Sequence, residues 1–372
     1  MKYETISMKS FQSISKWWFY LILLPIVLGV STWQGWAWWS WASAPVEVIE
    51  SGAEAGEKPV QIKIAQGTSA QQIGKDLETA GLIRSRQAWN FWSRWLMLRD
   101  AKGEFKAGTY QISPTQPLKT IADKIWRGEV MQISFTIPEG WSLRQMADYF
   151  ESQGFFKADE FMTAASQIPQ DQYPWLPNGL PHLEGFLFPD TYSIVSEQIT
   201  PQAIVKQMLE RFEKVALPIY QEGKSKTQFN LQEWVTLASI VEKEAVVQSE
   251  RTRIAGVFVA RLQKGMPLGA DPTVEYGLGI KQTADRTLTL AQVKTPSPYN
   301  TYINPGLTPT PIASPGLASL QATLEPEKTD FLYFVARYDG THVFSRTLAE
   351  HEAAQAKIQD ERKSRPASGS GN

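Results

Sequence analysis

The sequence contains no cysteine, and this absence excludes several kinds of chemistry. Disulfides, thiolate metal sites and a cysteine nucleophile all need a thiol, so none of them can be present. Histidine is also scarce. His182, His342 and His351 are the three in the chain, and they form no HExxH or other paired spacing of the kind that zinc enzymes use. We therefore expect no metal site and no cofactor.

A strong charge imbalance and a serine-hydrolase motif are missing as well. The formal net charge is -1 over 372 residues, which gives no electrostatic reason to expect a nucleic-acid partner. No G-x-S-x-G sequence occurs, so nothing indicates an α/β-hydrolase serine enzyme. The composition is otherwise that of a globular protein, 42% hydrophobic and 20% charged, with a length that suits two or three domains.

Residues 17–46 form an uncharged run that is preceded by Lys2, Lys9 and Lys16. About 20 apolar residues are enough for a helix to cross ~30 Å of hydrocarbon. Tryptophans gather at both ends of the run, as in the aromatic belts of membrane helices; they are Trp17, Trp18, Trp33, Trp36, Trp38, Trp39 and Trp41. We predict a cytoplasmic segment over 1–16, a single-pass transmembrane anchor over 17–41 and a linker over 42–57, with the rest of the chain outside the cytoplasm.

A cleaved signal peptide is the alternative interpretation of this region. Phe19–Val30 has the length of an h-region, and Ala42-Ser43-Ala44 resembles a cleavage site. The tryptophan-rich run after Val30 is unlike a polar c-region, and Pro45 would directly follow the cut. We therefore favour a retained anchor, and both interpretations export the rest of the protein.

An internal repeat follows the linker. One copy begins at Ile64 and the other at Ile137, and in each a strand is followed by Gly, then Ser, then an amphipathic helix that ends at Gly. The matched positions are Gly67, Ser69, Ile73, Leu77 and Gly81 in the first copy, and Gly140, Ser142, Met146, Phe150 and Gly154 in the second. Between the copies, 108–112 is strand-like, and Leu118, Ile121, Ala122 and Ile125 have helical spacing.

The strand–helix organisation of residues 58–132 resembles LysM domains, which are small glycan-binding modules of cell-wall proteins. The alternative is an α+β spacer that holds the later part of the chain away from the membrane, because similarity of fold alone does not establish binding.

The stretch 234–250 is predicted to be a central helix. Leu237, Ile240, Val241 and Glu244 share one face at helical spacing, so a carboxyl group is carried on an apolar side. Glu242 points about 200° away and is expected to face solvent. Apolar surroundings raise a carboxyl pKa, which keeps a general acid protonated near neutral pH. Alternatively, Glu244 lies at the rim of the apolar face and reaches water.

Other segments around this helix are predicted as follows. Residues 202–215 and 253–264 have helical periodicity, 331–336 is a buried strand and 362–372 is a disordered tail. Glu184 and Asp190 are expected to cap loops. The segments 271–277, 296–302 and 306–316 are predicted to be loops over a sugar cleft. There Tyr276, Tyr299 and Tyr302 can stack on sugar faces and Asn300 can bind an acetamido group, unless these side chains serve ordinary packing.

Taken together, these motifs resemble the endolytic murein transglycosylases (YceG-like). The resemblance runs from the membrane segment to about His351. It is carried by Lys106–Tyr110, Pro138–Gly140, Glu184-Gly185, Pro189–Thr191, Ser239–Glu244, Glu250-Arg251, Asp271–Val274, Tyr299–Tyr302, Gly316 and Leu332–Val335. The implied fold is α+β: a transmembrane helix, the LysM-like part, then a mixed α/β catalytic domain over 133–361 whose central helix carries the catalytic glutamate.

The resemblance implies a bacterial inner-membrane enzyme with a periplasmic catalytic domain. It would cut nascent peptidoglycan strands internally beside the cell-wall synthases (penicillin-binding proteins) and leave 1,6-anhydro-N-acetylmuramic acid ends. The family's catalytic glutamate falls on Glu244. The substrate-binding candidates are Glu184, Asp271, Thr273, Tyr276, Asn300 and Tyr302.

Two alternatives to this activity remain open at this point. One is a non-catalytic peptidoglycan-binding scaffold for the synthases. The other is a hydrolase that uses water, for which Asp271 or Glu184 could supply the second carboxyl group. The two carboxyls would then lie about 5–5.5 Å apart in a retaining enzyme, or about 6.5–9.5 Å apart in an inverting one.

Overall fold

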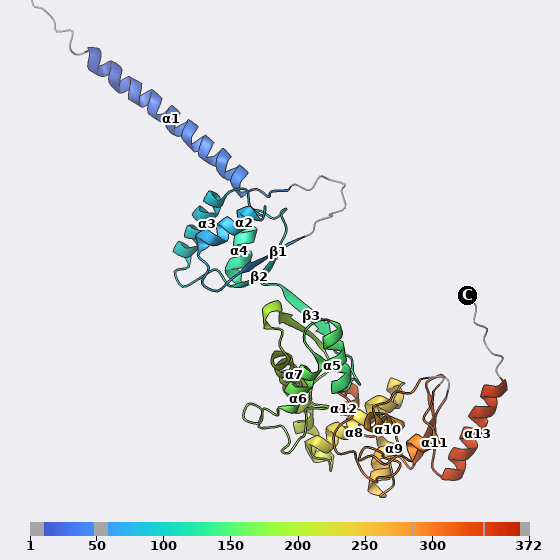
Figure 1. The fold of residues 1–372 in the computed structure, drawn as a ribbon. Coiled ribbons are helices and arrows are strands. Elements are labelled where there is room, and N and C mark those ends of the chain that lie inside the picture. The colour runs from blue at the N-terminus through green and yellow to red at the C-terminus, as the bar shows by residue number, and fades with distance from the viewer. Residues whose placement is uncertain (1–10, 48–58, 284–285, 338, 365–372) are drawn as a thin grey trace, which may run out of the picture. The chain divides into compact units, whose positions relative to one another are not determined.

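The computed structural model describes residues 11–47, 59–283, 286–337 and 339–364 (Figure 1). Within them, helices alternate with two-stranded sheets, which confirms the mixed α+β class. The chain divides into two compact units between Ile133 and Ser134, and Val195–Glu197 joins the N-terminal unit. Each unit has its own hydrophobic core.

The elements up to the boundary between the units are α1 (Phe11–Ser43), β1 (Val60–Ile64), α2 (Ala70–Thr79), α3 (Arg86–Arg99), β2 (Gly108–Ile112), α4 (Leu118–Arg127) and β3 (Gln132–Thr136), which crosses it. After these come α5 (Leu143–Ser152), α6 (Ala158–Ser166), β4 (Thr191–Val195), α7 (Pro201–Gly223), α8 (Leu231–Glu244), α9 (Arg251–Gln263), α10 (Asp271–Leu278), α11 (Leu290–Val293), α12 (Leu317–Leu324), β5 (Tyr333–Ala336), β6 (His342–Ser345) and α13 (Leu348–Ser364). Short 3₁₀ turns occupy Ser196–Gln198, Lys224–Lys226 and Gln248–Glu250.

The N-terminal unit is built on the antiparallel pair β1–β2, with Val60 opposite Ile112 and Ile64 opposite Gly108. Its helices bury one face each against a shared core. In α4 the buried positions are Leu118, Ile121, Ala122 and Ile125, which are the four that helical spacing predicts. Helix α3 is not predicted from the sequence.

The last turns of α1 pack on the same core, where Ala42 is fully buried and Trp39 is partly buried. The membrane-spanning helix expected at 17–41 is not found. No helix in the described part of the chain is both long enough and apolar enough to cross a bilayer. Residues 1–10 of the expected cytoplasmic segment and 48–57 of the expected linker lie outside the described residues.

Both copies of the repeat are confirmed. Ser69 caps α2 by accepting the N–H of Gln72, and Ser142 caps α5 by accepting the N–H of Gln145. Equivalent glycines have positive φ at both ends of each helix, at Gly67 and Gly81 and at Gly140 and Gly154. In both copies, therefore, a serine starts the helix and a glycine in the left-handed region takes the chain out of it.

The C-terminal unit is organised around α8, and the prediction of a central helix is confirmed. Every residue from Trp234 to Val241 is buried, and α9 and α12 pack against the helix. The Trp234 indole N–H donates to the carbonyl of Leu320 in α12, which ties the two helices together. The predicted end at Glu250 is wrong. Helix α8 stops at Glu244, where Ala245 becomes extended, and two β-branched valines that disfavour helix follow.

Of the other predicted elements, some are confirmed and some are wrong. Helix α7 covers 202–215, α9 covers most of 253–264, and 306–316 has no regular structure, as predicted. The predicted loop 271–277 is in fact α10, with Pro272 in its first turn and Gly279 as a left-handed C-cap. The strand β5 is partly exposed rather than buried, because it belongs to a two-stranded sheet. Residues 362–364 of the predicted tail belong to α13, and 365–372 lie outside the described residues.

Candidate active site

Glu244 is the last residue of α8, and its side chain is half-buried. No described residue forms a hydrogen bond with its carboxyl group, so the group is free to contact a substrate. The apolar face that the sequence predicts is present, since Leu237, Ile240 and Val241 are fully buried beside it. The structure thus presents a carboxyl group at the end of a rigid buried helix.

The surroundings of Glu244 favour its protonated form. Burial, followed by the negative charges of Asp271 and Glu275, raises the pKa of Glu244 to about 8 against the opposing charge of Arg261. The C-terminal end of a helix also carries partial negative charge, which acts in the same direction on a carboxylate. Glu244 can therefore hold a proton at neutral pH and release it to a substrate atom.

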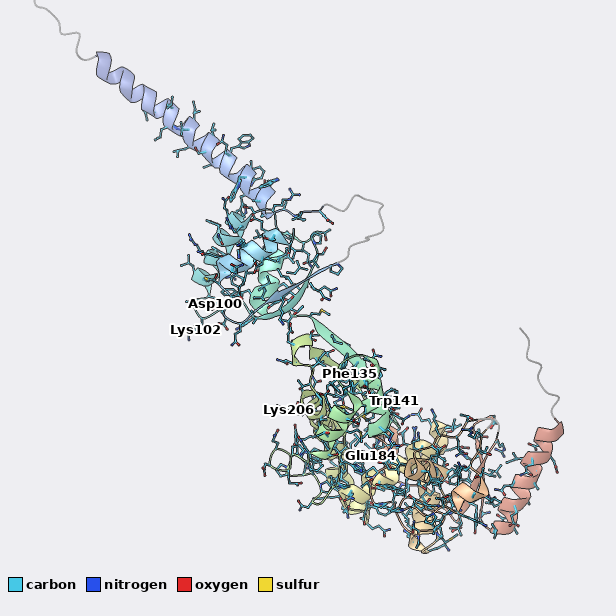
Figure 2. All side chains as sticks on the ribbon, viewed as in Figure 1. Asp100, Lys102, Phe135, Trp141, Glu184 and Lys206 are labelled. Carbon is cyan, nitrogen blue, oxygen red and sulfur yellow. The ribbon has the colours of Figure 1, made fainter. Side chains whose placement is uncertain are left out.

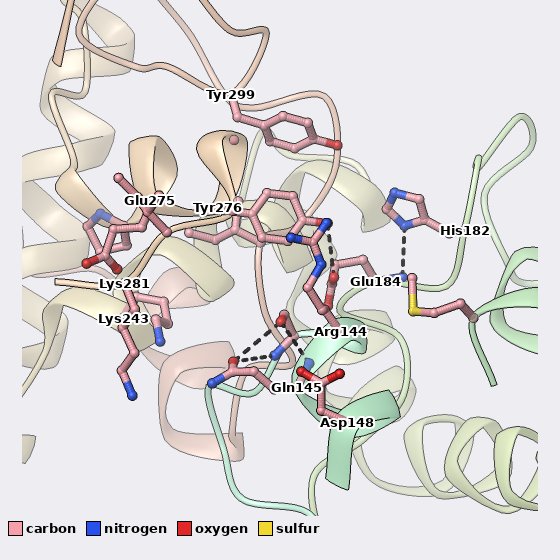
Figure 3. Close-up of a pocket in the computed structure, with 17 residues that line it drawn as sticks. Arg144, Gln145, Asp148, His182, Glu184, Lys243, Glu275, Tyr276, Lys281 and Tyr299 are labelled. Atoms are coloured by element: carbon pink, nitrogen blue, oxygen red, sulfur yellow. Dashed lines mark hydrogen bonds between the residues drawn. The ribbon is translucent and has the colours of Figure 1, made fainter. Parts of the chain in front are cut away.

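A cavity of about 560 Å³ lies beside the end of α8 (Figure 3). Glu244 does not line the cavity, but its neighbour Lys243 does, and so does Glu275, which acts electrostatically on Glu244. Figure 3 shows Lys243, Glu275 and Lys281 on one side of the cavity and Glu184 with His182 on the other. A cavity of this size, with charged and aromatic walls, suits a polar ligand such as a sugar.

Glu184 lies at the wall of this cavity and is 1% exposed. Its carboxylate accepts the N–H of Leu143, the first residue of α5, at 3.0 Å and the hydroxyl of Tyr276 at 3.0 Å. Burial raises the pKa of Glu184 to about 8, although these hydrogen bonds and Arg144 oppose the rise. The geometry fits the capping role expected from the sequence. Asp190 has a similar role, since it accepts the N–H of Thr191 and pairs with Arg211.

Asp271, Tyr276 and Tyr302 lie around α10. The Tyr302 hydroxyl donates to Asp271 at 2.6 Å, and the side-chain amide of Gln282 donates to the same carboxylate at 3.2 Å. Tyr276 lines the cavity with Tyr299, and their ring centres are 4.8 Å apart. The structure thus brings Asp271 into the charge environment of Glu244 and places Tyr276 on the cavity wall.

Thr273 and Asn300 are fully buried and are not placed to touch a substrate. The Thr273 hydroxyl donates to the carbonyl of Ala270 and lies 2.8 Å from the Thr301 hydroxyl. The Asn300 amide donates to the carbonyls of Val293 and Thr295, while its oxygen accepts the N–H of Tyr302. Thr273 ties the loop after α11 to α10, and Asn300 ties that loop to the end of α11. This packing role was the alternative considered for Asn300.

Sequence reasoning missed several residues of the cavity wall, among them Arg144, Asp148, His182, Lys243, Glu275 and Lys281. Glu275 could have been found, because it follows Asp271 by one helical turn and shares its face once α10 is recognised as a helix. Arg144 and Lys281 give no comparable signal, because the cavity is assembled from segments far apart in the chain. Among the described residues, no cluster of His, Asp and Glu is arranged to hold a metal ion.

The prediction that Glu242 faces solvent is wrong. Its carboxylate accepts the N–H of Gly316 at 3.0 Å and pairs with Arg251 at 3.5 Å, and both charged side chains are nearly buried. A Cβ at Gly316 would lie 2.0 Å from the Glu139 carboxyl group, so a larger residue there would require the Glu139 side chain to move. Burial and the charge of Glu242 raise the pKa of Glu139. This cluster fixes the last turn of α8, two residues before Glu244.

We expect Glu184→Ala to cost about 2–4 kcal/mol, because two donors lose a buried partner. Glu184→Gln keeps an acceptor for both and should cost much less. Because the folded-state pKa of Glu184 is raised, the wild type should lose stability as pH rises from about 4.5 through about 8, and the glutamine variant should lose less. Denaturant unfolding at several pH values measures both effects. Equal costs for the two variants would contradict the assignment.

Known proteins are similar in sequence to most of this chain. The model of the YceG-like family matches residues 62–357. The endolytic murein transglycosylase of Bacillus subtilis strain 168 is 34% identical over 324 residues, covering 83% of this chain and 88% of that protein. A protein of the same name from Streptococcus pneumoniae D39 is 33% identical over 79% of this chain, which spans 59% of that longer protein.

A solved structure extends the comparison to the fold. The crystal structure of a YceG-like protein from Listeria monocytogenes aligns with 80% of this chain and with all of that chain, with a TM-score of 0.55 and 32% identity. The family match therefore includes both units described above and the helix that carries Glu244. The chain belongs to the YceG-like family.

Proposed function

We propose that this protein is an endolytic murein transglycosylase and that Glu244 is its acid and base. The observation that carries the proposal is the uncommitted carboxyl group at the end of α8, whose pKa is raised to about 8. The relatives named endolytic murein transglycosylase supply the reaction class. The substrate is the glycan strand of peptidoglycan, and the bond cut joins N-acetylmuramic acid to N-acetylglucosamine.

In the first step, protonated Glu244 gives its proton to the glycosidic oxygen, and the bond from that oxygen to muramic C1 breaks. The resulting carboxylate then takes the proton of the muramic C6 hydroxyl, whose oxygen bonds to C1. Because the nucleophile belongs to the substrate, no water is consumed. Glu244 ends the reaction protonated, as it began. Arg261, which counters the other charges on Glu244, stabilises the carboxylate between the two steps.

The carboxyl groups considered for a hydrolase are otherwise engaged. Glu184 is buried and caps α5, and Asp271 accepts hydrogen bonds from Tyr302 and Gln282. A hydrolase would need one of them free to act as a nucleophile or as a base on water. Their engagement therefore favours cyclisation within the substrate over attack by water.

The raised pKa predicts the alkaline limb of the activity profile. Activity should fall as pH rises through about 8, where Glu244 loses the proton it must donate. Asp271→Asn removes a neighbouring negative charge, so the limb should move to lower pH. Asp148→Asn is a matched control, since Asp148 lines the cavity but is not among the charges that shift Glu244. Initial rates across pH measure the shift, and an unmoved limb in Asp271→Asn would contradict this account.

We also propose that residues 17–41 hold the enzyme at the bacterial inner membrane, with the C-terminal unit in the periplasm beside cell-wall synthases. The uncharged run and its flanking lysines and tryptophans support this location. Protease protection in spheroplasts tests it, and a protected C-terminal unit would contradict it.

We further propose that the N-terminal unit is a LysM-like module. The order β1–α2–α3–β2 supports this interpretation, which rests on fold similarity. Its test is binding of insoluble peptidoglycan by a Glu244→Gln variant of the full chain.

The enzymatic proposal is tested by incubating full-length protein in detergent with purified uncrosslinked glycan strands. Internal cutting should shorten the strands early and broadly, before small fragments accumulate. Release of disaccharides from strand ends while long strands persist would contradict an endolytic enzyme. Strands that bind but stay intact would favour the non-catalytic scaffold.

A further inference from the structure

Helix α3 carries apolar side chains on its buried face and also on an exposed face beside it. One face, which includes Ala88, Trp89 and Leu96, is buried in the core of the N-terminal unit. The other face consists of Phe91, Trp95 and Leu98, and we call these residues the α3 stripe. They follow i, i+4, i+7 spacing and are 64%, 40% and 85% exposed. A contiguous exposed apolar face on a folded unit marks a surface that something else covers.

The α3 stripe continues onto the end of α1 through ring contacts. Trp39 of α1 lies 5.4 Å from Phe91 and 6.1 Å from Trp92, and Trp92 lies 4.7 Å from Trp95, between ring centres. Other tryptophans in the last turns of α1 are also exposed, namely Trp36, Trp38 and Trp41. The two helices therefore share one aromatic surface, whose amphipathic rings suit the boundary between water and lipid.

The charged residues of helix α3 itself have one sign. Helix α3 contains Arg86, Arg94 and Arg99 and no acidic residue. Arg94 follows Phe91 by three positions and so borders the stripe, and the Arg99 guanidinium lies 5.4 Å from the Trp95 ring centre. Figure 2 labels Asp100 and Lys102 in the loop that follows α3, where the acidic residue offsets the fourth cation. Basic residues beside Trp, Phe and Leu are the composition of helices that lie on membrane surfaces.

We propose that the α3 stripe and the tryptophans at the end of α1 rest in the interface of a bilayer with anionic headgroups. The rings and Leu98 would enter the boundary of the acyl region, and the arginines would contact lipid phosphates. A second copy of this chain is a poorer partner for the surface, because the arginines of the two copies would repel each other. The docking does not depend on whether α1 crosses the membrane, and it is independent of the proposed enzymatic activity.

The cysteine-free sequence permits a clean test. Leu98→Cys in the full-length chain is labelled with an environment-sensitive fluorophore and reconstituted with vesicles of phosphatidylcholine and phosphatidylglycerol. Gln61→Cys, on the exposed face of β1, is the matched control. The label at position 98 should shift its emission to the blue and be quenched by nitroxide-labelled lipid, whereas the label at position 61 should stay unquenched.

Charge and apolar variants sharpen this test. In the Leu98→Cys background, Arg94→Gln and Arg99→Gln should each lower the ratio of docked to undocked protein on anionic vesicles by roughly fivefold. Phe91→Gln should lower this ratio on neutral and anionic vesicles alike. Equal, weak quenching at positions 61 and 98 would overturn the proposal. So would a blue shift at position 98 without lipid quenching, because the surface would then be covered by protein or glycan.

Discussion

Glu244→Gln is expected to lower the rate of strand cutting by at least about 10²–10⁴-fold while leaving the fold intact. Glutamine has nearly the shape of a protonated glutamate, but it can neither give up a proton to the glycosidic oxygen nor take one from the C6 hydroxyl. No hydrogen bond of the described residues depends on the Glu244 carboxyl group, so stability should change little. The measurement is the initial rate of shortening of purified glycan strands, with thermal unfolding recorded alongside.

The matched control for this variant is Glu233→Gln, at the other end of the same helix. Glu233 accepts the N–H of Asn230 in a capping box, a position where glutamine serves as well as glutamate. Each variant thus removes one carboxylate from α8, and only Glu244→Gln should lose activity. Full activity in Glu244→Gln would contradict the role assigned to Glu244, and an equal loss in both variants would point to damage to the helix.

Glu242→Ala is expected to cost at least about 2 kcal/mol of stability, because it leaves a nearly buried arginine and the N–H of Gly316 without their partner. Activity should also fall, since the cluster that fixes the end of α8 would loosen. A solvent-facing glutamate, as the helical spacing alone suggests, would change stability by no more than about 0.5 kcal/mol.

Denaturant unfolding separates these two descriptions of Glu242. Glu242→Gln is the informative companion, because it keeps an acceptor for Gly316 and removes only the charge. It should fall between the wild type and Glu242→Ala. If all three proteins unfold at the same denaturant concentration, the cluster described here does not contribute to stability.

Local signals in the sequence predict much of the fold. The repeat is readable because serine and glycine mark the ends of α2 and α5 in both copies, and their physical roles are strictly local. Helix α10 shows the limit of that approach. Its proline lies in the first turn and its glycine just after the end, where both are compatible with a helix, yet the same residues also suggest a loop.

Helix α3 was missed for a different reason. Apolar side chains around much of its circumference conceal the period that would identify it, and only the structure separates the buried face from the α3 stripe. The environment of Glu242 was mispredicted for a related reason. Glu242 does point away from Glu244, but α8 is surrounded by protein, so the direction that should have led to solvent leads to Arg251 and Gly316.

Within the candidate site, Glu244 could be predicted from the sequence and the cavity wall could not. Glu244 is found from its own helix, because the apolar side chains that surround it are its neighbours in sequence. The cavity wall is not found that way, since Arg144, Glu184 and Lys281 come from separate segments that tertiary packing brings together. Asn300 was assigned to a ligand on its chemistry, but burial in the fold uses all of its hydrogen-bonding groups for the loop.

The central claim is that Glu244 protonates the glycosidic oxygen and then directs the substrate's own C6 hydroxyl onto C1. Digestion of glycan strands in water enriched in ¹⁸O, followed by mass spectrometry of the new ends, tests it most directly. The account predicts 1,6-anhydro ends without ¹⁸O from the wild type and no new ends from Glu244→Gln. Reducing ends that carry ¹⁸O would show that water is the nucleophile and would contradict the claim.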